Sequence, residues 1–155
     1  MKQIFFAIIF LYTSNLFALT TDFNHLINIA DSKPGFSNDA EIQLVVFWAT
    51  WCKECKKKLA TTLPAWNQKS NLNIISINLD ANSDRANSFL QREKIPISVF
   101  KEPNKFLEKQ LKVIPVPHWA VFKKQKGENK TWKLIKHADG FDEDKILDVI
   151  QGKLS

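Results

Sequence analysis

The chain has 155 residues, of which 45% are hydrophobic, and its net charge at pH 7 is +6. This length and composition suit one globular domain with an adequate core and argue against a second full domain. Only Arg85 and Arg92 are arginines and the lysines are spread along the chain, so the charge indicates a solvated basic surface and not a nucleic-acid site, which needs clustered arginines and stacking aromatic residues.

The first eighteen residues have the order of an export signal. After an early lysine, residues 4–12 are apolar, residues 13–15 are polar, and Ala18 is a small residue after which a signal peptidase could cut. A permanent anchor is the weaker alternative, because a spanning helix needs about 20 apolar residues and this stretch is interrupted. We therefore expect residues 1–18 to be a signal peptide, residues 19–155 to be the mature domain, and the protein to be periplasmic or otherwise extracytoplasmic, without lipid binding beyond an uncleaved anchor.

The first element expected in the mature chain is a helix. Thr21 and Asp22 form a plausible cap, and apolar residues then recur at helical spacing up to a turn signal at residues 32–35. Those apolar residues are Phe23, Leu26, Ile27 and Ala30. Residues 43–49 follow as a run that is continuously apolar after Gln43, which is typical of a central strand covered on both faces.

Helices and strands then alternate to the end of the chain. Helices are expected over residues 53–63, 82–94, 104–112 and 142–150, and strands over residues 72–79, 97–100, 118–122 and 131–136. Pro64 should kink or end the first of these helices. The inner faces of the next two helices should carry Ala86, Phe89, Leu90, Phe106, Leu107 and Leu111.

This order of elements predicts an α/β fold with a central mixed sheet flanked by helices. The early strands should be parallel, and the last two should form an antiparallel hairpin with a turn at Gly127, closed by a C-terminal helix. The five tryptophans, Trp48, Trp51, Trp66, Trp119 and Trp132, are expected mostly in the core.

The chain has two cysteines, Cys52 and Cys55, directly after the expected central strand. A structural disulfide framework normally uses more cysteines at wider spacings, and zinc sites usually need four ligands. At the start of a helix, unpaired backbone N–H groups and the helix dipole stabilise a thiolate and lower the thiol pKa. We therefore expect Cys52 to be the attacking sulfur and Cys55 to resolve the mixed disulfide; an inert pair or part of a metal site is the alternative.

Residues 46–56, Val-Phe-Trp-Ala-Thr-Trp-Cys-Lys-Glu-Cys-Lys, resemble the active-site stretch of the thioredoxin superfamily. Thr50 before the Trp51-Cys52 pair resembles the exported TlpA/ResA/CcmG-like branch of that family. The resemblance implies a thioredoxin fold over residues 19–155 and dithiol–disulfide exchange with protein thiol or disulfide substrates. It implies no cofactor and no metal, and it implies a membrane or periplasmic electron donor.

A second signature supports the resemblance, because residues 111–122 are similar to the family segment in which a cis-proline precedes a strand that faces the cysteines. Pro117 is the matching position, and Pro115 is its competitor for the cis role. The family implies that Val116 offers backbone groups to a bound partner and that Pro117 keeps other groups away from the sulfurs. Trp51 should partly screen the cysteines.

Three departures from the family affect redox tuning. Glu54 stands before Cys55 where a proline is common, and the charges of Lys53 and Glu54 should shift the thiol pKa in opposite directions. Val46 and Lys58 stand where relatives carry an acid. The proton acceptor of Cys55 is therefore left open among Glu54, water and a residue not placed by the sequence.

The leading hypothesis is an extracytoplasmic reductase of specific partner proteins, such as in cytochrome c maturation. A disulfide-forming oxidase is one alternative. Another is a copper or metal-handling module that uses Cys52 and Cys55 with His118 or His137, although a histidine beside a strand is more often a packing residue. The last is an interaction domain that has kept the fold.

Overall fold

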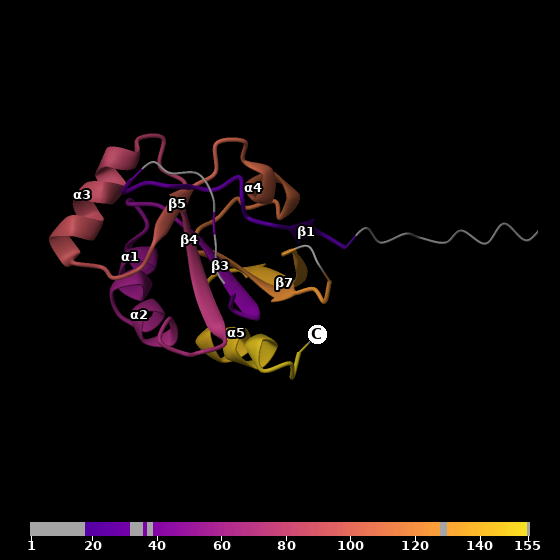
Figure 1. Cartoon of the computed structure of the whole chain (residues 1–155). Coiled ribbons are helices and arrows are strands. Elements are labelled where there is room, and N and C mark those ends of the chain that lie inside the picture. The colour runs from indigo at the N-terminus through magenta and orange to yellow at the C-terminus, as the bar shows by residue number, and fades with distance from the viewer. Residues whose placement is uncertain (1–17, 32–35, 37–38, 128–129, 155) are drawn as a thin grey trace, which may run out of the picture.

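The computed structural model describes residues 18–31, 36, 39–127 and 130–154, and its frame is one seven-stranded sheet in the order β1-β7-β6-β3-β4-β5-β2 (Figure 1). The strands are β1 (Thr20–Thr21), β2 (Ile27–Asn28), β3 (Ile42–Trp48), β4 (Leu72–Asn78), β5 (Val99–Lys101), β6 (His118–Lys124) and β7 (Trp132–Asp139). The helices are α1 (Lys53–Ala60), α2 (Thr62–Trp66), α3 (Ser83–Glu93), α4 (Phe106–Gln110) and α5 (Glu143–Ile150). Within the described part, no helix is long and apolar enough to cross a membrane.

Strand β3 lies at the centre of the sheet. It pairs in parallel with β4 and antiparallel with β6, and it is buried from Gln43 to Trp48. Strand β4 also pairs in parallel with β5, and β6 pairs antiparallel with β7. The edge strands β1 and β2 pair antiparallel with β7 and β5. The predicted mixed sheet, with parallel early strands and a C-terminal hairpin, is confirmed.

The sheet has a hydrophobic core on each face. One core joins alternate residues of β3, including Val46 and Trp48, to residues of α1, α2, α3 and α5. The other joins Val45 and Phe47 to α4 and to the N-terminal segment that contains Phe23. The alternation of β3 side chains between these two cores explains why the strand is apolar at every position from Leu44 to Trp48.

The predicted helix at the start of the mature chain is wrong. Residues 20–28 form the short strands β1 and β2 at the two opposite edges of the sheet, joined by a turn in which Phe23 has a φ of 59°. The Thr21 hydroxyl oxygen accepts the Phe23 N–H at 3.1 Å, and the Asp22 carboxylate accepts the Asn24 N–H at 3.0 Å. Such side-chain bonds compete with helical bonds. Phe23 and Leu26 are buried, so their spacing marked core residues correctly but not a helix.

The predicted helix over residues 53–63 is divided in two at Thr61, whose hydroxyl donates to the Lys57 carbonyl at 2.8 Å. Pro64 does not end the second piece. It is the third residue of α2, in the first turn, where a helix needs no backbone N–H. The helix after β5 is also shorter than predicted, and Phe106 is exposed at its start, in edge contact with the ring of His25.

Candidate active site

The two cysteines lie where β3 passes into α1. The Cys52 N–H donates to the Ala49 carbonyl at 3.0 Å, which closes a tight turn after the strand. Cys52 is the N-cap of α1, and its sulfur accepts the Cys55 N–H at 3.2 Å. The two sulfurs are joined in a disulfide, and Cys52 is 7% exposed whereas Cys55 is 2% exposed. The more accessible sulfur is therefore the one at the helix start.

This position favours a negative sulfur at Cys52. The first N–H groups of a helix have no partner within the helix and lie at the positive end of its dipole. When the disulfide is reduced, the Cys55 N–H is already directed at the Cys52 sulfur. Lys53 and Glu54 follow in the exposed first turn of α1, where water and salt weaken their opposite charges.

The loop before β6 faces the disulfide. The Val116–Pro117 peptide bond is cis, as the resemblance implies, so Pro115 does not take that role. The Cys52 sulfur lies 3.6 Å from the Val116 carbonyl oxygen. A disulfide sulfur carries no hydrogen, so this is a packing contact. The Pro117 carbonyl accepts the Gly140 N–H at 2.8 Å, which ties the loop to the turn after β7.

Two exposed apolar side chains flank the contact between Cys52 and Val116 in the sequence. Trp51, adjacent to Cys52, is 71% exposed, and Ile114, two residues before Val116, is 87% exposed. Large exposed apolar side chains around a reactive group are common at protein-binding surfaces. Ile114 was not predicted as a site residue, because no periodicity marks a loop residue.

Lys58 forms an ion pair with a residue of another helix. Its ammonium group donates to the Glu143 carboxylate of α5, and the Thr62 hydroxyl donates to the same oxygen at 3.0 Å. These two bonds hold the pKa of Glu143 below its ordinary value. Lys58 therefore connects α1 to α5, over the ring of Phe141 at 5.3 Å.

Val46 is buried in the core beneath α1, as an apolar residue would be. Its register partner on β4 is Ser76, whose hydroxyl is fully buried and has no protein hydrogen-bond partner in the described part of the chain. On the other side of Val46, its register partner on β6 is Trp119. A buried hydroxyl thus lies one strand away from the position where thioredoxin carries an acid.

His118 does not face the sulfurs. It pairs with Phe47, whose side chain belongs to the opposite core from Cys52, and the two rings are 5.9 Å apart. Its ring nitrogens lie 2.6 Å from the Asp139 carboxylate and 3.1 Å from the ring of His137. Burial of the ring, with a smaller contribution from His118, lowers the pKa of His137.

The hypothesis of a copper site that adds His118 or His137 to Cys52 and Cys55 is therefore wrong. His118 pairs with Phe47 and His137 with Ala120, so both histidines lie on the opposite face of the sheet from the sulfurs. Among the residues described, no three His, Cys, Asp or Glu side chains lie together in a way that could hold a metal ion.

Asp80 is a site residue that sequence reasoning missed. Its carboxylate accepts the Thr50 N–H at 3.0 Å and the Thr50 hydroxyl at 3.0 Å, and it accepts the Asn78 side-chain amide at 2.8 Å. A signal was present: Asp80 follows the end of β4, and the carboxyl ends of parallel neighbours such as β3 and β4 meet at one edge of a sheet.

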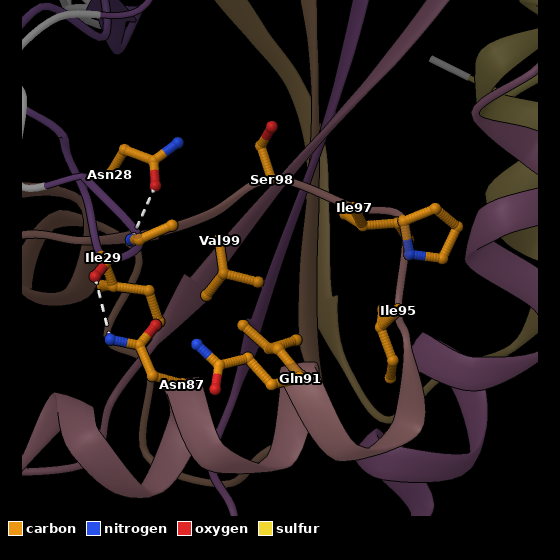
Figure 2. Close-up of a pocket in the computed structure, with 11 residues that line it drawn as sticks. Asn28, Ile29, Asn87, Gln91, Ile95, Ile97, Ser98 and Val99 are labelled. Carbon is orange, nitrogen blue, oxygen red and sulfur yellow. Dashed lines mark hydrogen bonds between the residues drawn. The ribbon is translucent and has the colours of Figure 1, made fainter.

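A separate pocket of about 420 Å³ lies between α3 and the segments of β2 and β5 (Figure 2). Two of its amides already bond within the chain, since Asn87 donates to the Ile29 carbonyl at 2.9 Å and Asn28 accepts the Ala30 N–H at 2.8 Å. The pocket borders the start of β5, whereas Cys52 follows the end of β3. It therefore lies at the β5–β2 edge of the sheet, separate from the disulfide that follows the central strand.

A family model described as thioredoxin-like matches residues 39–128. No curated protein sequence matches the chain.

Solved structures share the fold at low sequence identity. StoA from Bacillus subtilis has 18% identity and a TM-score of 0.62, over 86% of this chain and 97% of that one. A putative thiol:disulfide interchange protein DsbE from Chlorobium tepidum has 20% identity and a TM-score of 0.54, over 72% and 77%. A secreted Mycobacterium tuberculosis disulfide oxidoreductase homologous to E. coli DsbE has 12% identity and a TM-score of 0.57, over 84% and 97%. The predicted thioredoxin fold is confirmed.

Proposed function

This chain belongs to the thioredoxin-like family, and on that premise we propose that it is an extracytoplasmic thiol–disulfide oxidoreductase that reduces specific partner proteins. The observation that carries the proposal is the position of Cys52. Its sulfur accepts the Cys55 N–H at the start of α1 and lies 3.6 Å from the Val116 carbonyl of the cis-proline loop.

The reaction begins with the Cys52 thiolate. It attacks one sulfur of a partner disulfide, a new sulfur–sulfur bond forms, and the electron pair of the old bond leaves with the other partner sulfur as a thiolate. Cys55 then loses its proton and attacks the Cys52 sulfur. This step forms the Cys52–Cys55 disulfide and releases the second partner thiolate. Two electrons pass to the partner, and its two thiolates take up protons.

The surroundings of the disulfide suit a protein substrate. The exposed Trp51 and Ile114 offer apolar contact surface, and the Val116 backbone lies beside the attacking sulfur. An extended partner segment could pair with that backbone and present its own sulfur to Cys52. Pro117, which has no N–H, leaves the loop without a donor at that point.

Export and the direction of electron flow are parts of the proposal. Export rests on the order of residues 1–18, which lie outside the described residues, and the secreted oxidoreductase that shares the fold supports it. Because an exported compartment is oxidising, a reductase there needs a dedicated membrane or periplasmic donor. The CcmG-like character of residues 46–56 makes proteins of cytochrome c maturation the first candidate partners.

A trapping experiment tests the proposal. The full chain with Cys55→Ser should accumulate a mixed disulfide between Cys52 and its partner, because the second attack is removed. Dithiothreitol should release the partner, and mass spectrometry should identify it.

The matched control is Cys52→Ser, which removes the attacking sulfur and should give no such adduct. Adducts formed by Cys52→Ser and not by Cys55→Ser would contradict the assigned roles. Partners that lose their disulfides when the protein is deleted from cells would show an oxidase instead of a reductase.

A further inference from the structure

The turn that carries Cys52 is fixed to the end of β4 through one side chain. Its central residues are Thr50 and Trp51, and the Ala49 carbonyl and the Cys52 N–H close it. Trp51 is 71% exposed, so burial of this side chain does little to hold the turn. Thr50 is instead bonded through both its N–H and its hydroxyl to Asp80, which is 30 residues away in the sequence.

Asp80 is itself held in place. The Asn78 amide donates to its carboxylate at 2.8 Å, the Asp80 N–H donates to the Asn78 side-chain oxygen at 3.2 Å, and Asn78 is only 5% exposed. The Leu79 N–H also donates to the Trp48 carbonyl at 2.9 Å, so the ends of β3 and β4 are joined directly. Asp80 is therefore a rigid acceptor and Thr50 is its donor.

We propose that Asp80, acting through Thr50, is a positioning residue that keeps Cys52 at the N-cap of α1 in the reduced protein. This inference rests on the proposed exchange function. In the reduced protein no disulfide joins the two sulfurs, and the Cys52 thiolate is stabilised only while it stays directed at the Cys55 N–H. The Thr50–Asp80 bonds hold the preceding turn in the geometry that this requires.

The negative charge of Asp80 would have an effect on the Cys52 thiolate opposite to that of positioning. If Asp80 acted on Cys52 mainly by its negative charge, it would destabilise the thiolate, and removing the charge would favour it. The carboxylate accepts three donors from Thr50 and Asn78, which offset much of its field. Positioning and charge thus predict opposite changes in the reactivity of Cys52.

Asp80→Asn and Thr50→Val separate these two effects. The asparagine has one acceptor oxygen, so its NH₂ group would face the donors of Thr50 or Asn78. Valine keeps the shape of threonine without its hydroxyl. For both variants of the reduced full chain, iodoacetamide labelling of Cys52 at pH 6 should slow by about three- to tenfold, the range expected for a weakened helix-terminus interaction. Above the pH at which every thiol is ionised, the rates should equal that of the wild type.

Two controls are matched to these variants. Thr50→Ser keeps the hydroxyl and should label at the wild-type rate. Asp84→Asn removes an exposed carboxylate four residues from Asp80 and should also label at the wild-type rate. Urea unfolding of each variant shows whether the fold is intact. If Asp80→Asn does not fold, the comparison of Thr50→Val with Thr50→Ser tests the positioning role.

Unchanged or faster labelling of Thr50→Val and Asp80→Asn at pH 6 would overturn the proposal, even if both variants unfold at lower urea. A failure of the proposed function looks different, because the Cys55→Ser protein would then trap no partner in a mixed disulfide, whatever the labelling rates.

Discussion

Cys52 and Cys55 are chemically identical but lie in different surroundings. Cys52 caps α1 and touches the cis-proline loop, whereas Cys55 lies one turn into the helix and is almost fully buried. Burial in apolar surroundings disfavours a thiolate, and a helix start favours it. One residue should therefore react with other molecules and the other only with its neighbour.

Labelling of the reduced protein tests this difference. At mildly acidic pH, iodoacetamide should modify Cys52 first, because a larger share of its sulfur is ionised and accessible. Peptide mapping after brief treatment identifies the labelled residue. Preferential modification of Cys55 would refute the division of roles.

Among the elements, those with long periodic or continuously apolar sequences were predictable. Strands β3 and β4 and helix α5 lie within a residue or two of their expected bounds, because burial on fixed faces leaves a clear pattern. The segment from Thr21 to Ala30 was not predictable, because its apolar spacing is helical while its Thr and Asp side chains bond the local backbone. Two-residue strands carry too few side chains to leave a period.

The packing of helix α5 against α1 and α2 depends in part on Glu143, which no local pattern marks. Its carboxylate binds Lys58 of α1 and Thr62 of α2. Since the pKa of Glu143 is lowered in the folded state, its contribution to stability is present above its ordinary pKa of 4.5 and is lost as the pH falls below that value.

Glu143→Gln should consequently lower the free energy of unfolding at pH 7 by less than about 1 kcal/mol, because the carboxylate is partly exposed and screened. The difference from the wild type should shrink at pH 3. Urea unfolding at both pH values measures this, with the exposed neighbour Asp144→Asn as the control. A difference that grows on acidification would contradict the sign.

At the scale of the whole molecule, sheet topology assembles the site. Cys52 and Val116 are 64 residues apart, yet the antiparallel register that pairs Phe47 with His118 brings the end of β3 beside the start of β6. The family resemblance identified both partners from the sequence. It did not identify Asp80, because the bond between Thr50 and Asp80 depends on the parallel pairing of β3 with β4.

The redox poise of the assembled site is the property that function depends on most. A thiolate stabilised by about 1.4 kcal/mol shifts a two-electron couple about 30 mV towards a more oxidising potential. The helix start at Cys52 acts in that direction, and the exposed charges of Lys53 and Glu54 largely cancel. The potential should then lie between about −270 mV, as in thioredoxin, and about −120 mV, as in the oxidant DsbA, nearer the former.

Equilibration of the full chain with dithiothreitol and glutathione buffers of known potential, followed by thiol trapping of Cys52 and Cys55, measures this midpoint directly. We predict one two-electron transition in the stated interval, nearer the thioredoxin end. A midpoint near the DsbA end would make the protein an oxidase. A midpoint below about −300 mV, the range of structural disulfides, would contradict the central claim that the Cys52–Cys55 pair exchanges with partner proteins.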